Sequence, residues 1–309
     1  MHTEIFIQTL DEFNYTSSPN FFEKSEDSSI LCLPGFEILF YNFNKIIVSN
    51  TQHTPGILTS SDVQEKEKLF YLLSEEAKQY STNLKSTHHI TTDQTGGKLI
   101  YDFVFNNLAM ELETKNAELY LPKKKDYEFV KEKLKNVSKK IVTINGRNLG
   151  PERDFGRNNS FFDLINFLIS NNFFVVNCTL PSPIFSHIFD KDSYLEILED
   201  ELYDYSRNVA YFLNSNCLVS VSNSGGITNH ICTKTNLIIF GSGNYQDNQR
   251  WVDNPKYGFN NKSLFEISKK IKPTHMTQDF EIIKDVINSL DKPSDIKFFD
   301  ENKIVNYEI

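Results

Sequence analysis

Short apolar runs alternate with polar, helix-like stretches along the second half of the chain. These runs are predominantly apolar and do not alternate strictly between apolar and polar positions, which is typical of strands that are buried on both faces of a parallel sheet. The predicted strands of this half are residues 140–145, 173–178, 217–222 and 236–240. Strands that alternate with helices predict an α/β fold with a parallel sheet.

The stretch between the first two of these strands has the periodicity of a helix. Ser160 is its predicted N-cap, and Asn171-Asn172 is its predicted end. Strand, helix and strand together form one βαβ unit, whose crossover is expected to be right-handed.

The remaining elements are less regular. Further helices are predicted over residues 194–213 (in one or two pieces), 227–233, 263–270 and 278–290, and 291–309 is predicted to be a tail. In the first half the predicted strands are 30–33, 45–48 and 117–121, and the predicted helices are 63–80 and 126–137, while 99–112 fits a helix or a strand plus a helix. Because a fresh βαβ series begins near Ser138, we predict domains over 1–138 and 139–290.

Composition narrows the function classes. The 309 residues are 39% hydrophobic and 24% charged, with a net charge of −9, which indicates a globular, acidic protein. A general nucleic-acid binder would present a basic surface, so no nucleic-acid partner is expected. The short run Lys123-Lys124-Lys125 is interpreted as the cap of a domain surface, with weak attraction to an anionic membrane surface as the alternative.

The cysteines and the apolar segments bear on the compartment. No two of the four cysteines have CxxC spacing, so we expect free buried thiols in a reducing compartment, the cytoplasm. The first residues lack a basic flank and a long apolar stretch, so no signal peptide is expected. Residues 161–176 are too polar to span a membrane.

A glycine pair follows the third predicted strand in the turn Asn223-Ser224-Gly225-Gly226. Glycines let a backbone approach a ligand closely, and the N-terminus of the following helix favours phosphate. The alternative is a plain turn that uses glycine for steric reasons. No Walker A loop and no GxGxxG motif are present at this turn.

A second candidate loop, residues 146–159, follows the first predicted strand and contains three arginines. Arginine suits bidentate recognition of a diphosphate, whereas the alternative is solvated arginines paired with Glu152 and Asp154. Since both loops follow the carboxyl ends of strands, they should open at one edge of the sheet and together predict a site for an anionic ligand. The residues concerned are Asn145, Gly146, Arg147, Arg153, Arg157 and Asn158, and Asn223, Ser224, Gly225 and Gly226.

From Lys140 to Gly243 the order of these features resembles the donor-binding half of GT-B glycosyltransferases. The likeness is greatest to bacterial surface-polysaccharide glycosyltransferases and more distant to heptosyltransferases and fucosyltransferases. Where heptosyltransferase-like enzymes carry Asp-Thr/Ser-Gly-Pro, this chain has Asn223 in place of the Asp and Gly226 in place of the Pro.

The resemblance implies two Rossmann-like domains with parallel sheets that face a cleft. It implies a nucleotide-sugar donor, a glycan or lipid-linked glycan acceptor, inversion at the sugar carbon and no metal cofactor. Arg147, Arg153 or Arg157 and the backbone at Ser224 would neutralise the departing diphosphate. Thr228 could assist, and the loop that begins at Gly241 would lie near the nucleobase.

An inverting transferase also needs a base, which should come from the first half of the chain. Asp93, in the Gly-rich turn 93–98, is the preferred candidate; the others are Glu37, Asp102, His88 and His89. Three rival functions stay open: a sugar-nucleotide epimerase on the same fold, a non-catalytic nucleotide-sugar-binding protein, and an interaction protein with a relic site.

Overall fold

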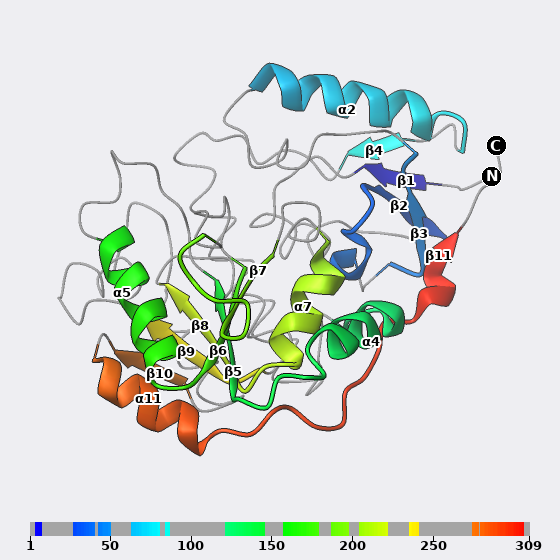
Figure 1. Cartoon of the computed structure of the whole chain (residues 1–309). Coiled ribbons are helices and arrows are strands. Elements are labelled where there is room, and N and C mark those ends of the chain that lie inside the picture. The colour runs from blue at the N-terminus through cyan, green and yellow to red at the C-terminus, as the bar shows by residue number, and fades with distance from the viewer. Residues whose placement is uncertain are drawn as a thin grey trace.

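The structure is a computed structural model of the whole chain (Figure 1). It describes the backbone of residues 4–7, 27–40, 43–50, 63–80, 84–86, 121–145, 157–178, 187–197, 204–221, 235–240, 274–277 and 279–305. The predicted elements at 99–112, 227–233 and 263–270, and nearly all of 117–121, lie outside these residues.

The second half of the chain forms a six-stranded parallel sheet, which confirms the predicted α/β class. Its order is β10-β9-β8-β5-β6-β7. The strands are β5 (Ile141–Asn145), β6 (Phe174–Asn177), β7 (Tyr194–Glu196), β8 (Cys217–Val221), β9 (Leu237–Phe240) and β10 (Thr274–Thr277). The four predicted apolar runs are thus strands β5, β6, β8 and β9, all internal to the sheet, where both faces are covered.

Helices cover both faces of this sheet (Figure 1). Val142 and Val219 belong to a core cluster with residues of α5 (Arg157–Ser170) and α11 (Phe280–Ser289). Their sequence neighbours Ile141 and Leu218 belong to a second cluster with α7 (Tyr205–Leu213). Successive strand residues point to opposite faces, so the two clusters mark the two sides of the sheet.

Four strands of the first half and one strand from residues 304–305 form a five-stranded parallel sheet of order β11-β3-β2-β1-β4. Its strands are β1 (Glu4–Ile7), β2 (Ser28–Cys32), β3 (Lys45–Val48), β4 (Leu84–Ser86) and β11 (Ile304–Val305). Helix α2 (Val63–Ala77) buries Leu69 and Leu73 in the core of this sheet and exposes Tyr71. The predicted strands 30–33 and 45–48 and the predicted helix 63–80 are confirmed.

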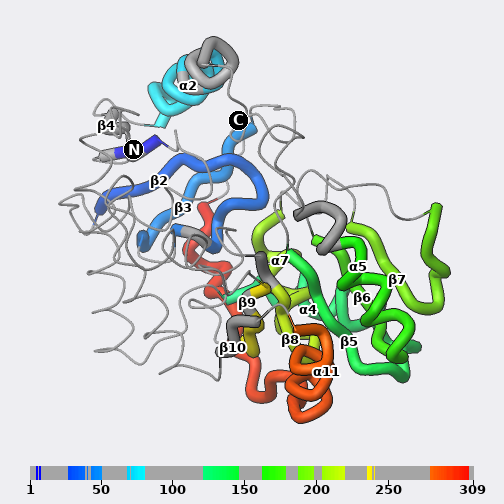
Figure 2. The backbone as a smooth tube through the Cα atoms, turned by 90° about the vertical axis from the view of Figure 1, so that its left-hand side faces the viewer, coloured from blue at the N-terminus to red at the C-terminus, as the bar shows by residue number. Residues whose placement is uncertain are grey.

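One core cluster runs from the first sheet to the inner face of the second. It includes Ile30 and Ile46 of the first sheet, Val130 of α4 (Lys124–Lys133), and Tyr211 of α7. The segment after α11 crosses back along α4 and reaches the first sheet, as the orange-to-red tube of Figure 2 shows. There the short helix η3 (Glu301–Lys303) leads into β11.

Three sequence predictions are corrected here. Tyr194–Glu196 is a strand at the edge of the second sheet rather than helix, and α7 begins only at Tyr205, after the N-cap Asp204. Helix α5 begins at Arg157, so Ser160 lies inside its first turns and is not the N-cap. The predicted tail contains β11. This strand has two residues and forms by pairing with the distant β3, so the local sequence does not indicate it.

Candidate functional site

The order of strands in the second sheet reverses between β5 and β8. From β5 the chain continues outward to β6 and β7, and it then returns to the other side of β5 to form β8, β9 and β10. Open parallel sheets bind ligands in the crevice outside the carboxyl ends of the strands at such a reversal. The ends of β5 and β8 therefore define the candidate site.

The segments singled out in the sequence leave the sheet at this edge. Residue 146 follows Asn145 of β5, residue 222 follows Val221 of β8, and residue 241 follows Phe240 of β9. Asn145 pairs in register with Ser220, and Val221 pairs with Phe240. Neighbouring strands lie about 4.8 Å apart, so the three segments start side by side.

Most of the predicted site residues lie outside the described residues. These are Asp93, Gly146, Arg147, Arg153, Asn223, Ser224, Gly225, Gly226, Thr228 and Gly241. The alternative base candidates His88, His89 and Asp102 lie there too.

Three predicted residues are placed at the edge. Asn145 is the half-buried last residue of β5, and Arg157 and Asn158 begin α5. Since α5 follows β5, its N-terminus opens at the carboxyl edge of the sheet. The first turn of α5 contains a basic residue and no acidic one, so the positive end of the helix dipole is not neutralised within that turn. An anion is favoured at such a helix end.

A buried polar pair, Asn177 and Tyr194, joins two strands near the same edge of the sheet, and the sequence analysis did not predict it. Asn177, the last residue of β6, is fully buried, and its Nδ2 donates to the Tyr194 hydroxyl at 2.9 Å. Burial, partly offset by this hydrogen bond, raises the pKa of Tyr194 well above its usual value, so the phenol stays neutral. The pair fixes the edge strand β7 to β6.

The first sheet holds a carboxylate at its own carboxyl edge. Glu76 of α2 is nearly buried; its Oε2 accepts from Ser49 Oγ at 2.5 Å, and its Oε1 accepts from the backbone N–H of Asn50 at 2.9 Å. Ser49 and Asn50 directly follow β3. Glu76 thus fixes the end of this strand. The sequence does not indicate this role, because Glu76 is one of several acidic residues in a Lys/Glu-rich helix.

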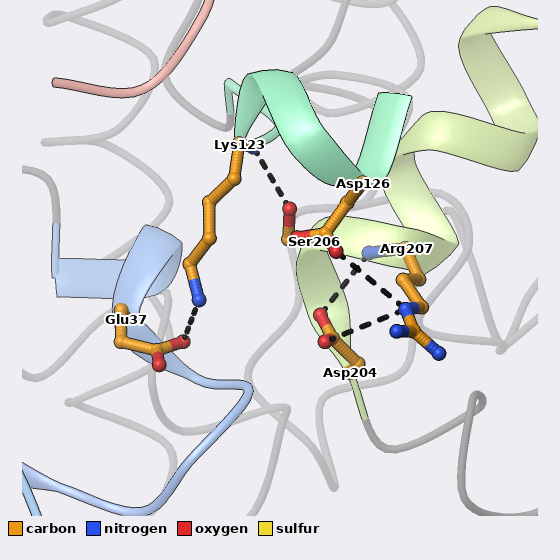
Figure 3. Close-up of polar contacts among 6 residues, drawn as sticks. All are labelled: Glu37, Lys123, Asp126, Asp204, Ser206 and Arg207. Carbon is orange, nitrogen blue, oxygen red and sulfur yellow. Dashed lines mark hydrogen bonds and ion pairs between the residues drawn. The ribbon is translucent and has the colours of Figure 1, made fainter. Parts of the chain in front are cut away.

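Glu37 was one of the alternative base candidates. Its side chain is only 5% exposed, and its Oε2 lies 2.9 Å from Lys123 Nζ (Figure 3). A carboxylate in a buried ion pair is not accessible to an acceptor hydroxyl, so Glu37 does not suit the role of base. The same contact corrects the interpretation of the lysine run, because Lys123 is buried whereas Lys124 and Lys125 are exposed.

Asp190 and Asp192 have a spacing at which two carboxylates could share a divalent cation. They lie in an exposed turn directly before β7, where Asp190 Oδ1 accepts from the backbone N–H of Asp192 at 3.1 Å. This turn is at the amino edge of the sheet, opposite the candidate site. Within the described ranges, no group of three or more His, Cys, Asp or Glu residues could hold a metal ion.

In the part of the chain that the structure describes, no helix has the length and apolar character needed to cross a membrane.

Comparisons with known proteins give distant structural neighbours. No protein-family model matches the chain, and no curated protein matches it. The glycosyl transferase family 9 structure from Veillonella parvula DSM 2008 is 12% identical with a TM-score of 0.44, over 96% of this chain and 92% of that chain. A structure of the wall teichoic acid polymerase TagF is 10% identical with a TM-score of 0.37, over 90% of this chain and 87% of that chain.

TM-scores this low carry no functional argument, so the function proposed for the chain rests on its own topology and residues.

Proposed function

We propose that the chain is a glycosyltransferase that binds a nucleotide sugar outside the carboxyl ends of β5 and β8 and transfers the sugar to a glycan or lipid-linked glycan. The observation that carries this proposal is the reversal of strand order between these two strands. It brings the start of the arginine-bearing segment and the start of the glycine-pair segment to neighbouring positions, at the kind of edge that binds ligands in open sheets.

In this proposal the second half of the chain, residues 139–290, is the donor-binding domain. The diphosphate lies at the N-terminus of α5, near Arg157 and Asn158, with Arg147 and Arg153 on the preceding segment. As the sugar leaves, negative charge develops on the diphosphate, and fixed cations and backbone N–H groups stabilise it. These side chains take the part that a metal ion plays elsewhere, so the reaction is metal-independent.

The first half, residues 1–138, supplies the acceptor site and the base. A base must lie within hydrogen-bond reach of the acceptor hydroxyl, and Asp93 is the residue proposed for this role. Glu37 is set aside because Lys123 holds it in a buried ion pair. Attack by the activated hydroxyl from the side opposite the nucleotide would invert the configuration of the sugar carbon.

Nucleotide binding is the first test of this function. Ligands that bind only the folded state raise the melting temperature. We expect one of UDP, GDP, CMP, dTDP or their sugars to raise it equally with and without EDTA, and Arg147→Ala and Arg157→Ala to abolish the shift. Lys131→Ala is a matched control, because Lys131 is 61% exposed on the outer side of α4.

Turnover separates an enzyme from a binding protein. With water as the acceptor of the sugar, the wild-type chain should hydrolyse the donor that stabilises it and release free nucleotide, and Asp93→Asn should bind this donor with unchanged affinity but release no nucleotide. Binding without release in the wild type would indicate a non-catalytic nucleotide-sugar-binding protein. The absence of any thermal shift at millimolar ligand would reject the donor site.

A further inference from the structure

A cluster of charged side chains lies where the first sheet meets the second half of the molecule (Figure 3). Glu37 belongs to η2 (Glu37–Phe40), which follows β2. Lys123 and Asp126 belong to the start of α4, and Asp204 and Arg207 belong to the start of α7. These five residues, which we name the charged joint, come from three separate segments of the chain.

The backbone holds the same three segments together. The N–H of Tyr205 donates to Gly35 O at 2.9 Å, which ties α7 to the turn before η2. The N–H of Lys123 donates to Ser206 Oγ at 2.8 Å, which ties the start of α4 to α7 (Figure 3). The rings of Phe36 and Tyr205 pack with centroids 4.9 Å apart. The joint is therefore part of a packed contact rather than a loose surface.

Its charges do not balance. Three carboxylates face two cations, so the joint carries one surplus negative charge when every member is ionised. Lys123 Nζ lies 2.9 Å from Glu37 Oε2, and Arg207 Nε lies 3.5 Å from Asp126 Oδ1 and 3.9 Å from Asp204 Oδ2. Asp126 is almost fully buried, and its Oδ2 has no hydrogen-bond partner among the described residues. A buried carboxylate oxygen without a partner is costly.

We propose that the charged joint is a proton-controlled contact between the first sheet and helices α4 and α7, in which uptake of one proton by the surplus carboxylate tightens the contact. This inference is independent of the proposed transferase activity. Asp204 is the member that takes the proton, since the charges of Asp126 and Glu37 act on it, while Arg207, its one ion-pair partner among the described residues, is shared with Asp126.

The titration of Asp204 fits this assignment. Burial, and after it the charge of Asp126, raises the pKa of Asp204 from 3.8 to about 6. The Arg207 N–H and Lys123 lower this pKa, and Glu37 raises it slightly. A carboxyl with a raised pKa binds its proton more tightly in the folded protein than in the unfolded chain. Its stabilising effect is therefore complete below pH 3.8 and is lost as the pH rises through about 6.

Asp204→Asn tests the proposal, because asparagine caps a helix as well as aspartate does but carries no charge. Asp279→Asn is the matched control: Asp279 caps α11 in the same way, with Oδ1 accepting from the N–H of Glu281 at 2.9 Å, but it is exposed and lies outside the joint. The measurement is amide hydrogen exchange of peptides that contain η2 and the start of α7, at about pH 5 and about pH 8.

At about pH 8 we expect Asp204→Asn to protect both peptides at least about tenfold more strongly than the wild type, since one pKa unit corresponds to a tenfold change. At about pH 5 the difference should shrink severalfold, because the wild-type carboxyl is then mostly protonated. The proposal would be overturned if Asp204→Asn increased protection over the wild type equally at the two pH values. It would also be overturned if Asp279→Asn increased the protection of these peptides as much as Asp204→Asn does.

A measurement on the wild type makes the proposal testable even if the variant fails to fold. Carbon-detected NMR of the side-chain carboxyls should show the Asp204 resonance titrating near pH 6. The η2 and α7 amide shifts should move at the same midpoint. Titration of Asp204 in the range usual for aspartate, or η2 and α7 amides that do not respond to it, would reject the joint as a proton-controlled contact.

Discussion

The pair of Glu37 and Lys123 is the most completely buried ion pair among the described residues, with side chains 5% and 6% exposed. Removing one member of a buried pair leaves the other charge without compensation. We expect Glu37→Gln to lower the free energy of unfolding by about 3 kcal/mol, measured by urea denaturation. The double variant Glu37→Gln/Lys123→Met should recover part of this loss, because it no longer buries an unpaired ammonium group.

Asp27→Asn provides the contrast. Asp27 also pairs with a lysine, Lys45, at 3.2 Å, but the two side chains are 71% and 40% exposed. Exposed pairs contribute about 0–1 kcal/mol, so this change should be nearly neutral. A loss in Asp27→Asn as large as in Glu37→Gln would mean that burial is not what makes the Glu37 pair important.

At the scale of elements, the C-terminus of α11 depends on one lysine. Lys140 Nζ donates to the carbonyl oxygens of Asn288 at 2.7 Å, Leu290 at 2.8 Å and Ile287 at 3.3 Å. A cation at this end satisfies free carbonyls and interacts favourably with the helix dipole. Lys140→Met should therefore lower the free energy of unfolding by about 1–2 kcal/mol in urea denaturation. Lys297→Met, at an exposed position outside any helix, should have no comparable effect.

The end of α5 depends on a left-handed residue. Asn172 has φ 65°, and the N–H of the next residue, Phe173, donates to Leu168 O at 3.1 Å. Glycine adopts this conformation without steric cost, whereas a β-branched residue does not. Asn172→Gly should leave the thermal midpoint unchanged or raise it, and Asn172→Val should lower stability by about 1–2 kcal/mol. Equal midpoints for the two variants would contradict this account of the helix end.

The elements differ in how far sequence could predict them. β5, β6, β8 and β9 are predominantly apolar runs inside the second sheet, so their nearly continuous hydrophobicity identified them as buried strands. β7 is a three-residue edge strand, and its Tyr194 and Leu195 also fit a helical pattern. The sequence predicted the same surface position for Lys123 as for Lys124 and Lys125, because the local sequence does not indicate its ion pair with the distant Glu37. For the candidate site, sequence predicted that the segments after β5 and β8 leave the sheet at one edge, which the strand register bears out, while contacts such as Asn177 with Tyr194 depend on tertiary pairing.

At the scale of the whole molecule, the segment after α11 joins the two sheets. Phe299 is 7% exposed in the core cluster that includes the first sheet, and its N–H donates to Pro122 O at 3.0 Å. Replacing a buried phenylalanine by alanine costs about 3–5 kcal/mol, so Phe299→Ala should destabilise the chain by about that amount in urea denaturation. Ile188→Ala is the control, because Ile188 is 61% exposed and should tolerate the change. A neutral Phe299→Ala would show that this crossing adds little to stability.

The pairing of β11 with β3 also has a consequence for biosynthesis. Ile304 lies beside Ile46 in the first sheet, so two positions near opposite ends of the described chain are neighbours in one sheet. During translation, β3 is synthesised early but cannot gain this neighbour until residue 304 has left the ribosome. Until then one edge of the first sheet is open, and unpaired strand edges are where nascent chains associate wrongly. The sheet that contains β1 is thus completed only after every strand of the six-stranded sheet has been synthesised.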